Sequence, residues 1–282
     1  MKLITWNIQW CRGCDGRVDP RRIAGQARAL ADFDLLCLQE VAANYPALDG
    51  SHGENQFALL AELLPEYTAV AGAAVDAPAD GGGRRVFGNM IFSRLPVMQV
   101  LRIQLPWPAD PQVASMPRLL LEATVMAPSG ALGIMTTHLE YYSALQRAAQ
   151  VEALRARHAE ACAHALADRV RDDSQSPFQS QPQTLSAIVT GDFNMRPDDP
   201  LHARLLEDFS GAVPAFDDVW QQLHPDRPQP PTLGVHDHEQ WPEPYACDFI
   251  FATRDLRERL RGIRVDGATD ASDHQPMLLE LA

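Results

Sequence analysis

The chain has 282 residues and a formal net charge of −13 at pH 7. Hydrophobic residues make up 46% and charged residues 22%, which excludes an intrinsically disordered chain and leaves enough apolar material for a large core. No stretch reaches the roughly 20 consecutive apolar residues that a membrane-spanning helix needs. The negative charge repels polyanions, so we expect weak binding to long duplex DNA and leave a small or single-stranded phosphate ligand open.

The cysteines and the first residues indicate the compartment. Five cysteines in a chain of this length do not make a disulfide framework, and Met1 and Lys2 lead at once into Leu-Ile-Thr-Trp-Asn rather than into a signal peptide. We therefore expect a cytoplasmic protein, and a monomer. Cys11 and Cys14 have the spacing of half a zinc site, but no second pair accompanies them, so they indicate a loop that carries two thiols.

The first half of the chain alternates strands with helices. Residues 2–8 alternate apolar and polar side chains as a strand does, and Asp19-Pro20 opens a helix over 20–31. The continuous apolar run 34–40 is typical of a strand that is covered on both faces. The other elements expected in this half are a helix over 55–64 and strands near 67–70, 86–93, 96–104, 118–127 and 131–138.

The second half repeats this theme after a long helix over 143–168, where His158 falls on the apolar stripe and is expected to pack in the core. Strands in both halves favour a single domain over residues 1–282, and we expect residues 1–140 and 141–282 to contribute one sheet each. The other expected elements are strands over 185–192, 247–251 and 275–280, a helix near 200–209, and loops over 72–88, 104–117, 172–184 and 223–244.

Polar residues stand at the ends of these strongly apolar strands. Any one of them could be a helix cap or a satisfied buried group. Together they form an oxygen-rich, anionic set, which predicts a ligand. The set contains Asn7, Glu40, Asn89, His138, Asp192, Asn194, Asp248, Asp273 and His274.

The chemistry of this set favours a hard divalent cation. Carboxylate and amide oxygens are the ligands that Mg²⁺ or Mn²⁺ prefers, and the absence of clustered cysteines and histidines argues against zinc. Histidines next to carboxylates supply an acid or a charge stabiliser near neutral pH. The segment His236-Asp-His-Glu239 indicates a solvated loop rather than a second metal site, because its proline-rich flanks give no fixed geometry.

Seven segments in chain order resemble the signature of the endonuclease/exonuclease/phosphatase superfamily. Gly-Asp-x-Asn and Ser-Asp-His are each modest signals, but seven segments in the family order make a chance match improbable. The resemblance implies an α/β fold, a DNase I-like four-layered αββα sandwich of two mixed β-sheets flanked by helices, with a site at one rim of the sheets. The segments are Thr5-Trp-Asn7, Gln39-Glu40, Gly88-Asn-Met-Ile-Phe-Ser93, Thr137-His138-Leu139, Gly191-Asp-Phe-Asn194, Asp248-Phe-Ile and Ser272-Asp-His-Gln-Pro276.

The resemblance also implies a Mg²⁺ or Mn²⁺ dependent phosphoester hydrolase. Glu40 would hold the metal, with Asn7 and Asp273 beside it. A bound cation and the phosphate positioned next to it would account for the oxygen-rich ends of the strands, because phosphoryl transfer needs positioning and neutralised charge more than covalent help.

Five further residues would carry the chemistry. Asp192, steadied by Asn194, would stay ionised, orient the attacking water and deprotonate it. His274, paired with Asp248 and cationic, would bind the scissile phosphate and stabilise its developing charge. His138 would contact the same phosphate or assist the leaving group.

Substrate choice is expected to depend on residues around this set. Asn89 would form a secondary polar wall, and the arginines could bind further phosphate groups. The candidates in loops are Arg84, Arg85 and Arg118 for phosphates and Tyr141, Trp107 and Trp241 as stacking surfaces.

His138 separates this chain from one branch of the family. Abasic-site endonucleases usually carry a Tyr-x-Pro-Asn type segment at that place, whereas a histidine resembles pancreatic-type deoxyribonucleases, sphingomyelinases and phosphoinositide or nucleotide phosphatases. Ala246-Cys247 also departs from the family, which often has a basic or β-branched residue before the Asp248 position. Three functions stay open: a phosphodiesterase or phosphatase for a small or single-stranded substrate, a nuclease acting on DNA or RNA, and a catalytically silent binding scaffold.

Overall fold

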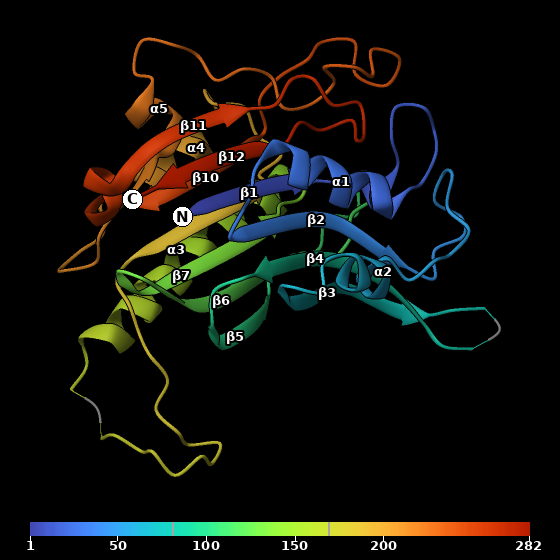
Figure 1. Cartoon of the computed structure of the whole chain (residues 1–282). Helices are drawn as coiled ribbons and strands as arrows, with labels where there is room; N and C mark the ends of the chain where they lie inside the picture. The colour runs from blue at the N-terminus through green and yellow to red at the C-terminus, as the bar shows by residue number, and fades with distance from the viewer. Residues whose placement is uncertain (81, 169) are drawn as a thin grey trace.

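The computed structural model describes residues 1–80, 82–168 and 170–282. Within them, two mixed sheets of six strands pack face to face and helices cover the outer faces (Figure 1). The strand order is β11-β12-β1-β2-β4-β3 in the first sheet and β5-β6-β7-β8-β10-β9 in the second. The expected four-layered sandwich of two mixed sheets is confirmed.

The elements have the following bounds. The strands are β1 (Lys2–Asn7), β2 (Leu35–Ala43), β3 (Thr68–Pro78), β4 (Arg84–Ser93), β5 (Val97–Gln104), β6 (Leu119–Ala127), β7 (Gly130–His138), β8 (Ala187–Asp192), β9 (Phe216–Asp218), β10 (Asp248–Thr253), β11 (Leu260–Val265) and β12 (Met277–Leu281). The α-helices are α1 (Pro20–Leu30), α2 (Gln56–Leu63), α3 (Ala144–Leu166), α4 (Pro200–Leu206) and α5 (Val219–Leu223), and the 3₁₀ helices are η1 (Gln9–Cys11) and η2 (Arg254–Arg259).

The apolar run of β2 shows why its sequence does not alternate. Leu35 and Cys37 pack in the core between the two sheets, whereas Leu36 and Leu38 pack in a second core beneath α1 and α2. Because both faces of the strand are covered, the four positions from Leu35 to Leu38 are all apolar. A third core under α3 and α4 covers the outer face of the second sheet in the same way.

Local signals place the helices. The carboxylate of Asp19 accepts the backbone N–H groups of Arg21 and Arg22, which caps α1 just before Pro20. On α3, His158 packs against Phe216 with ring centroids 4.4 Å apart, and its Nε2 lies 2.8 Å from a backbone carbonyl. The expected core role of His158 is confirmed.

The division of the two sheets between the chain halves is wrong. Strands β11 and β12 from the C-terminal half complete the first sheet beside β1, and strands β5, β6 and β7 from the first half belong to the second sheet. Antiparallel pairing of β12 with β1 satisfies the free edge that β1 would otherwise present, and this pairing cannot be seen in the order of the elements.

The segment 72–88 is not a loop. It forms most of a long hairpin in which β3 pairs with β4 from Thr68–Ser93 to Pro78–Arg84. The small residues of β3 hide the alternation that marks a strand. The strand β9, the helix α5 and the strand β11 were also missed; they are three, five and six residues long.

The two ends of the chain lie side by side (Figure 1). The amino group of Met1 donates to the carbonyl of Leu281 at 2.7 Å, and β1 pairs along its length with β12. Among the helices that the structure describes, none is long and apolar enough to pass through a lipid bilayer.

Gly191→Ala should lower the melting temperature of the protein. Gly191 has a φ of +138°, and a Cβ at this position would lie 1.9 Å from the carbonyl oxygen of Thr137 on β7. Strain and overlap together should destabilise the fold by roughly 2 kcal/mol or more. Gly25→Ala in α1 is the matched control, because nothing lies within 4 Å of its added Cβ and alanine favours a helix. Calorimetric melting of both variants tests this, and equal melting temperatures would contradict it.

Candidate active site

Three polar side chains are placed in a row by the register of the second sheet. His138 at the end of β7 pairs with Asp192 at the end of β8, and Asp192 pairs in turn with Asp248 at the start of β10. Neighbouring strands lie about 4.8 Å apart, so adjacent residues of this row can interact. The Nε2 atom of His138 is 3.5 Å from Oδ2 of Asp192.

Glu40 reaches this row from the first sheet through a bulge in β2. The pairing of β2 with β4 shifts between Leu38 and Val41, and Glu40 has a positive φ of 60°. A bulge redirects one side chain of a strand, and such strained backbone is common at functional sites. As a result Oε1 of Glu40 lies 3.8 Å from Nδ1 of His138 on the opposite sheet.

Asn7 links the two sheets at the centre of this cluster. Its Nδ2 donates to Oε1 of Glu40 and to Oδ2 of Asp192, both at 3.0 Å. Its Oδ1 accepts the backbone N–H of Gln9 at 3.1 Å. Asn7 therefore turns its amide N–H groups, and not its oxygen, toward the carboxylates.

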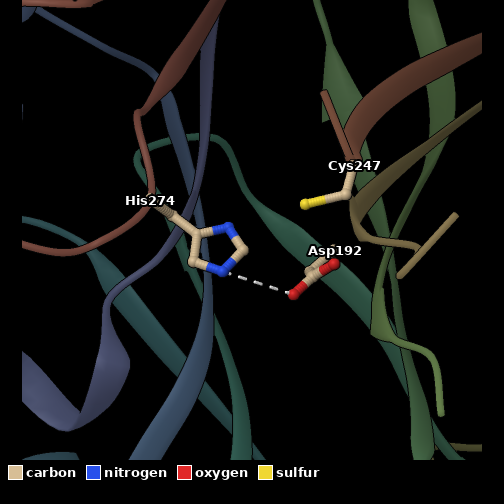
Figure 2. Close-up of side chains that lie close together, drawn as sticks. All are labelled: Asp192, Cys247 and His274. Carbon is tan, nitrogen blue, oxygen red and sulfur yellow. Dashed lines mark ion pairs between the residues drawn. The ribbon is translucent and has the colours of Figure 1, made fainter. Parts of the chain in front are cut away.

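His274, in the loop before β12, lies between the carboxylates of Asp248 and Asp192. Its Nδ1 lies 2.8 Å from Oδ2 of Asp248, so the expected contact between these two residues is present. Its Nε2 lies 3.6 Å from Oδ2 of Asp192, the ion pair drawn in Figure 2. Burial alone would lower the pKa of His274, but Asp248 and Asp192 outweigh it and raise this pKa well above its ordinary value. The imidazole is therefore cationic near neutral pH.

Asp192 is buried and accepts a backbone hydrogen bond. The N–H of Asn194 donates to its Oδ1 at 2.9 Å, and the side chain of Asn194 is held by the carbonyl of Leu139. Burial raises the pKa of Asp192 to about 6, against the opposing effect of cationic His274. The carboxylate is thus ionised at pH 7 but holds a proton more readily than an exposed aspartate does.

Glu40 and His138 are also shifted by their surroundings. Burial, reinforced by the charge of Asp273, raises the pKa of Glu40 to about 7. Burial, with Arg118 and His274 nearby, lowers the pKa of His138 well below its ordinary value, which leaves the ring neutral. The ligand atoms of Glu40, His138 and Asp192 all lie within 4.8 Å of one another, so this group could hold a metal ion.

Asp273 is fixed by three donors. Its Oδ2 accepts from Nε2 of Gln9 and from Nε1 of Trp241, each at 3.0 Å, and Ser272 donates to its Oδ1 at 3.3 Å. Gln9 and Ser272 did not stand out in the sequence, because a glutamine or serine that positions a carboxylate looks like any other polar loop residue. The two-residue spacing of Gln9 from Asn7 was the signal that could have identified Gln9.

A cavity of about 430 Å³ opens onto these groups. Of the residues expected to select the substrate, Arg118, Tyr141 and Trp241 line it. The Nε atom of Arg118 donates to Oε2 of Glu140 at 3.1 Å in a buried ion pair that the sequence did not suggest. The predicted site residues that line the cavity are Glu40, His138, Asp192, Asn194, Asp273 and His274.

Other predicted substrate residues lie elsewhere. Asn89 is buried and donates to the carbonyl of Leu119, outside the lining of this cavity. Arg84 contacts Asp76 along the β3–β4 hairpin at 2.6 Å, and Trp107 donates to Ser115 at 2.9 Å. The structure therefore does not bring Arg84 or Trp107 to the cluster of carboxylates and histidines, whereas Asn89 lines a small adjoining pocket together with Arg118 and His138.

None of the five cysteines forms a disulfide, and two of them, Cys247 and Cys14, lie near the site. Cys247 is buried with its thiol directed toward Asp192 and His274 (Figure 2), and burial raises its pKa well above the ordinary value, so it stays protonated. Cys14 contacts the carbonyl of Ser272, next to Asp273, at 3.6 Å. Cys11, at the end of η1, and Cys14 are free thiols.

This geometry defines a class of fold. Two mixed sheets in a four-layered sandwich, with carboxylates and histidines collected at one rim, are the architecture of DNase I-like proteins. The chain belongs to the endonuclease/exonuclease/phosphatase family, whose model matches residues 4–274. Members of this family are hydrolases that act on phosphoester bonds and generally use a divalent metal.

Solved structures support the same fold. An endonuclease/exonuclease/phosphatase from Beutenbergia cavernae DSM 12333 is 26% identical with a TM-score of 0.66, over 100% of this chain and 72% of that one. A mannosyl-6-phosphatase from Bacteroides thetaiotaomicron VPI-5482 is 16% identical with a TM-score of 0.65, over 100% and 99% of the two chains. D. rerio TDP2 in complex with a single-stranded DNA product is 21% identical with a TM-score of 0.61, over 100% and 98%. Comparison with curated proteins finds no match by sequence.

Proposed function

We propose that this protein hydrolyses a phosphoester bond of a small or single-stranded substrate with the help of Mg²⁺ or Mn²⁺. The observation that carries the proposal is the meeting of Asp192, the His274–Asp248 pair and Glu40 at one cavity. A base, a cation and a further carboxylate within a few ångströms are what attack of water on a phosphate requires.

The donor set fits a hard divalent cation. Glu40 and Asp273 would hold it, because the charge of Asp273 acts on Glu40 and raises its pKa, and both line the cavity. The Oε1 atom of Gln9 is buried and has no partner among the described residues. It would therefore be free to act as a further oxygen ligand of the cation beside Asp273. When bound, such a cation supplies positive charge for the phosphate oxygens. Asn7 would position Glu40 through its N–H group.

The chain's own residues divide the remaining work. Asp192, held by the N–H of Asn194, would take a proton from the attacking water. His274, kept cationic by Asp248, would stabilise the charge that develops on the phosphate oxygens. Neutral His138 could donate a hydrogen bond to the same phosphate or assist the leaving group.

The affinity for Mn²⁺ should rise as the pH increases through about 7. The pKa of Glu40 is raised from 4.5 to about 7 in the folded protein, so in the window between these values Glu40 holds a proton that the cation must displace. Above about 7 the carboxylate is free and the competition ends. Titration calorimetry with Mn²⁺ on both sides of this pH measures the effect. An affinity that does not change with pH would contradict Glu40 as a ligand.

The proposed activity is tested by a substrate screen. Purified protein with Mn²⁺ is assayed against phosphomonoesters, generic phosphodiesters, nucleotides, single-stranded DNA and duplex DNA. We expect hydrolysis of small or single-stranded substrates and little binding of duplex DNA at physiological salt, since the chain carries a net charge of −13. Efficient cleavage of duplex DNA would favour the nuclease alternative. Absence of hydrolysis of every substrate, with Mn²⁺ bound, would favour a binding scaffold.

A further inference from the structure

One side of the cavity that holds the carboxylates is apolar. Trp10, Tyr45, Leu48 and Phe87 line it together with Glu40, and we call the three rings, those of Trp10, Tyr45 and Phe87, the aromatic wall. The rings of Tyr45 and Phe87 meet edge to face with centroids 6.3 Å apart. A wall of this kind next to a phosphate-binding centre gives a flat ring a surface to stack on.

Strained backbone holds part of the wall in place. Gln9, Trp10 and Cys11 are three consecutive residues with positive φ values of 42°, 44° and 61°. The indole N–H of Trp10 donates to the carbonyl of Asp49 at 2.9 Å, and Gln56 donates to the carbonyl of Trp10 at 2.6 Å. Non-glycine residues adopt this conformation only where the surroundings impose it, which is typical of a site that positions a ligand.

A second group of rings borders the cavity from the other sheet. Tyr141 and Tyr142 follow β7, and their centroids lie 4.8 Å apart, while Trp241 lies 6.0 Å from Tyr141. All three line the cavity, and Trp241 is anchored by its hydrogen bond to Asp273. Tyr141 and Tyr142 are 38% and 65% exposed, so their rings are open to a ligand.

Few positively charged side chains line this cavity. Among the described residues that line the cavity, Arg118 is the one arginine. Its ion pair with Glu140 balances its charge. Its Nη1 atom is buried and has no partner among the described residues, which leaves one donor for a single acceptor oxygen. Arg84 is paired with Asp76, and Arg85 lies over the ring of Tyr45, 5.7 Å from its centroid. Further arginines, Arg147 and Arg196, line the adjoining pocket beside Tyr141 and Trp241 and not this cavity.

We infer that the substrate is a phosphoester with a flat ring, a nucleobase or an aryl group, which stacks on the aromatic wall while Arg118 donates to one oxygen. This inference rests on the proposed function, because it places the phosphate at Asp192 and His274.

Matched ligand pairs test the inference. Uridine 5′-monophosphate is compared with ribose 5-phosphate, and phenylphosphonate with methylphosphonate, by titration calorimetry in the presence of Mn²⁺. Stacking of one base on an aromatic side chain contributes enough to predict that the ligand with a ring binds about tenfold tighter or more. A preference in the first pair identifies a nucleobase site, and a preference confined to the second pair identifies an aryl site.

Variants show whether the aromatic wall causes the tighter binding of ligands that carry a ring. Tyr45→Ala should reduce the advantage of the ring to about twofold or less, and Tyr45→Phe should retain it. Phe178→Ala is the control, because Phe178 is 85% exposed and does not line the cavity. Equal affinities within both pairs, no binding of any of the four ligands, or a ring preference that Tyr45→Ala leaves intact would overturn the inference. Phosphate release is followed in parallel. A ring preference without any hydrolysis would count against the proposed function and leave the ring site standing.

Discussion

Asp192→Asn and His274→Ala should each lower the turnover number for a phosphodiester by about 10² or more, the scale expected for loss of a positioned base or charge stabiliser. The amide that replaces the carboxylate of Asp192 could not take a proton from water, although its oxygen would keep the contact with the N–H of Asn194. Removal of His274 would leave Asp248 buried beside a void and remove the cation that faces Asp192. Both effects act on the reacting centre rather than on substrate binding, so the Michaelis constant should change less than the turnover number.

The measurement is manganese-dependent hydrolysis of a generic phosphodiester, with circular dichroism and thermal melting to verify the fold of each variant. His236→Ala is the matched control for the histidine, because His236 lies in an exposed loop outside the cavity. Wild-type turnover by a folded His274→Ala protein would mean that the His274–Asp248 pair is structural. Wild-type turnover by Asp192→Asn would mean that Asp192 is not the base that takes a proton from the attacking water.

Glu40→Gln should weaken Mn²⁺ binding and lower the turnover number, each by roughly 10² or more, since loss of a carboxylate ligand removes a charge that holds the cation. The substitution keeps the shape of the side chain and its contact with Asn7. It also removes a buried carboxylate whose pKa is raised to about 7, so the metal-free variant should be at least as stable as the wild type at pH 8.

Direct binding of Mn²⁺, measured by titration calorimetry, separates the loss of metal from other causes of inactivity. Glu62→Gln serves as control, because Glu62 is exposed on α2 and far from any lining position of the cavity. A Glu40→Gln protein that binds Mn²⁺ as tightly as the wild type but is inactive would assign Glu40 a role other than metal binding.

The sequence predicted the centre of the site better than its edges. His138, Asp192 and Asp248 could be identified because each ends or begins an apolar strand, and a polar residue there needs a partner. Their side chains then meet because β7, β8 and β10 are neighbours with matching ends. Glu40 was found for the same reason, although the bulge that turns it toward His138 leaves no mark in the residue pattern.

Residues in loops could not be placed in this way. Tyr45 and Trp10 come to the cavity through turns whose course is decided by contacts with distant segments, such as the hydrogen bond from Trp10 to Asp49. Arg84 looked like a phosphate ligand because 72–88 was interpreted as a loop, whereas the hairpin pairs it with Asp76. The prediction of which strands belong to which sheet was wrong for a related reason, since the pairing of β12 with β1 joins residues at opposite ends of the chain.

The pairing of β1 with β12 means that the first sheet can be completed only late in synthesis. During synthesis β1 has β2 on one side and an open edge on the other, because β12 follows all the other strands of the fold in the chain. Asp273 and His274 reach the site only when the loop before β12 has emerged, so the nascent chain holds Glu40 and Asp192 without the residues that complete the centre. Contacts between such distant residues form slowly during folding, and the exposed edge of β1 is open to other strands until they do. Until β12 has been made, the fold therefore keeps an exposed strand edge and lacks two residues of the candidate site.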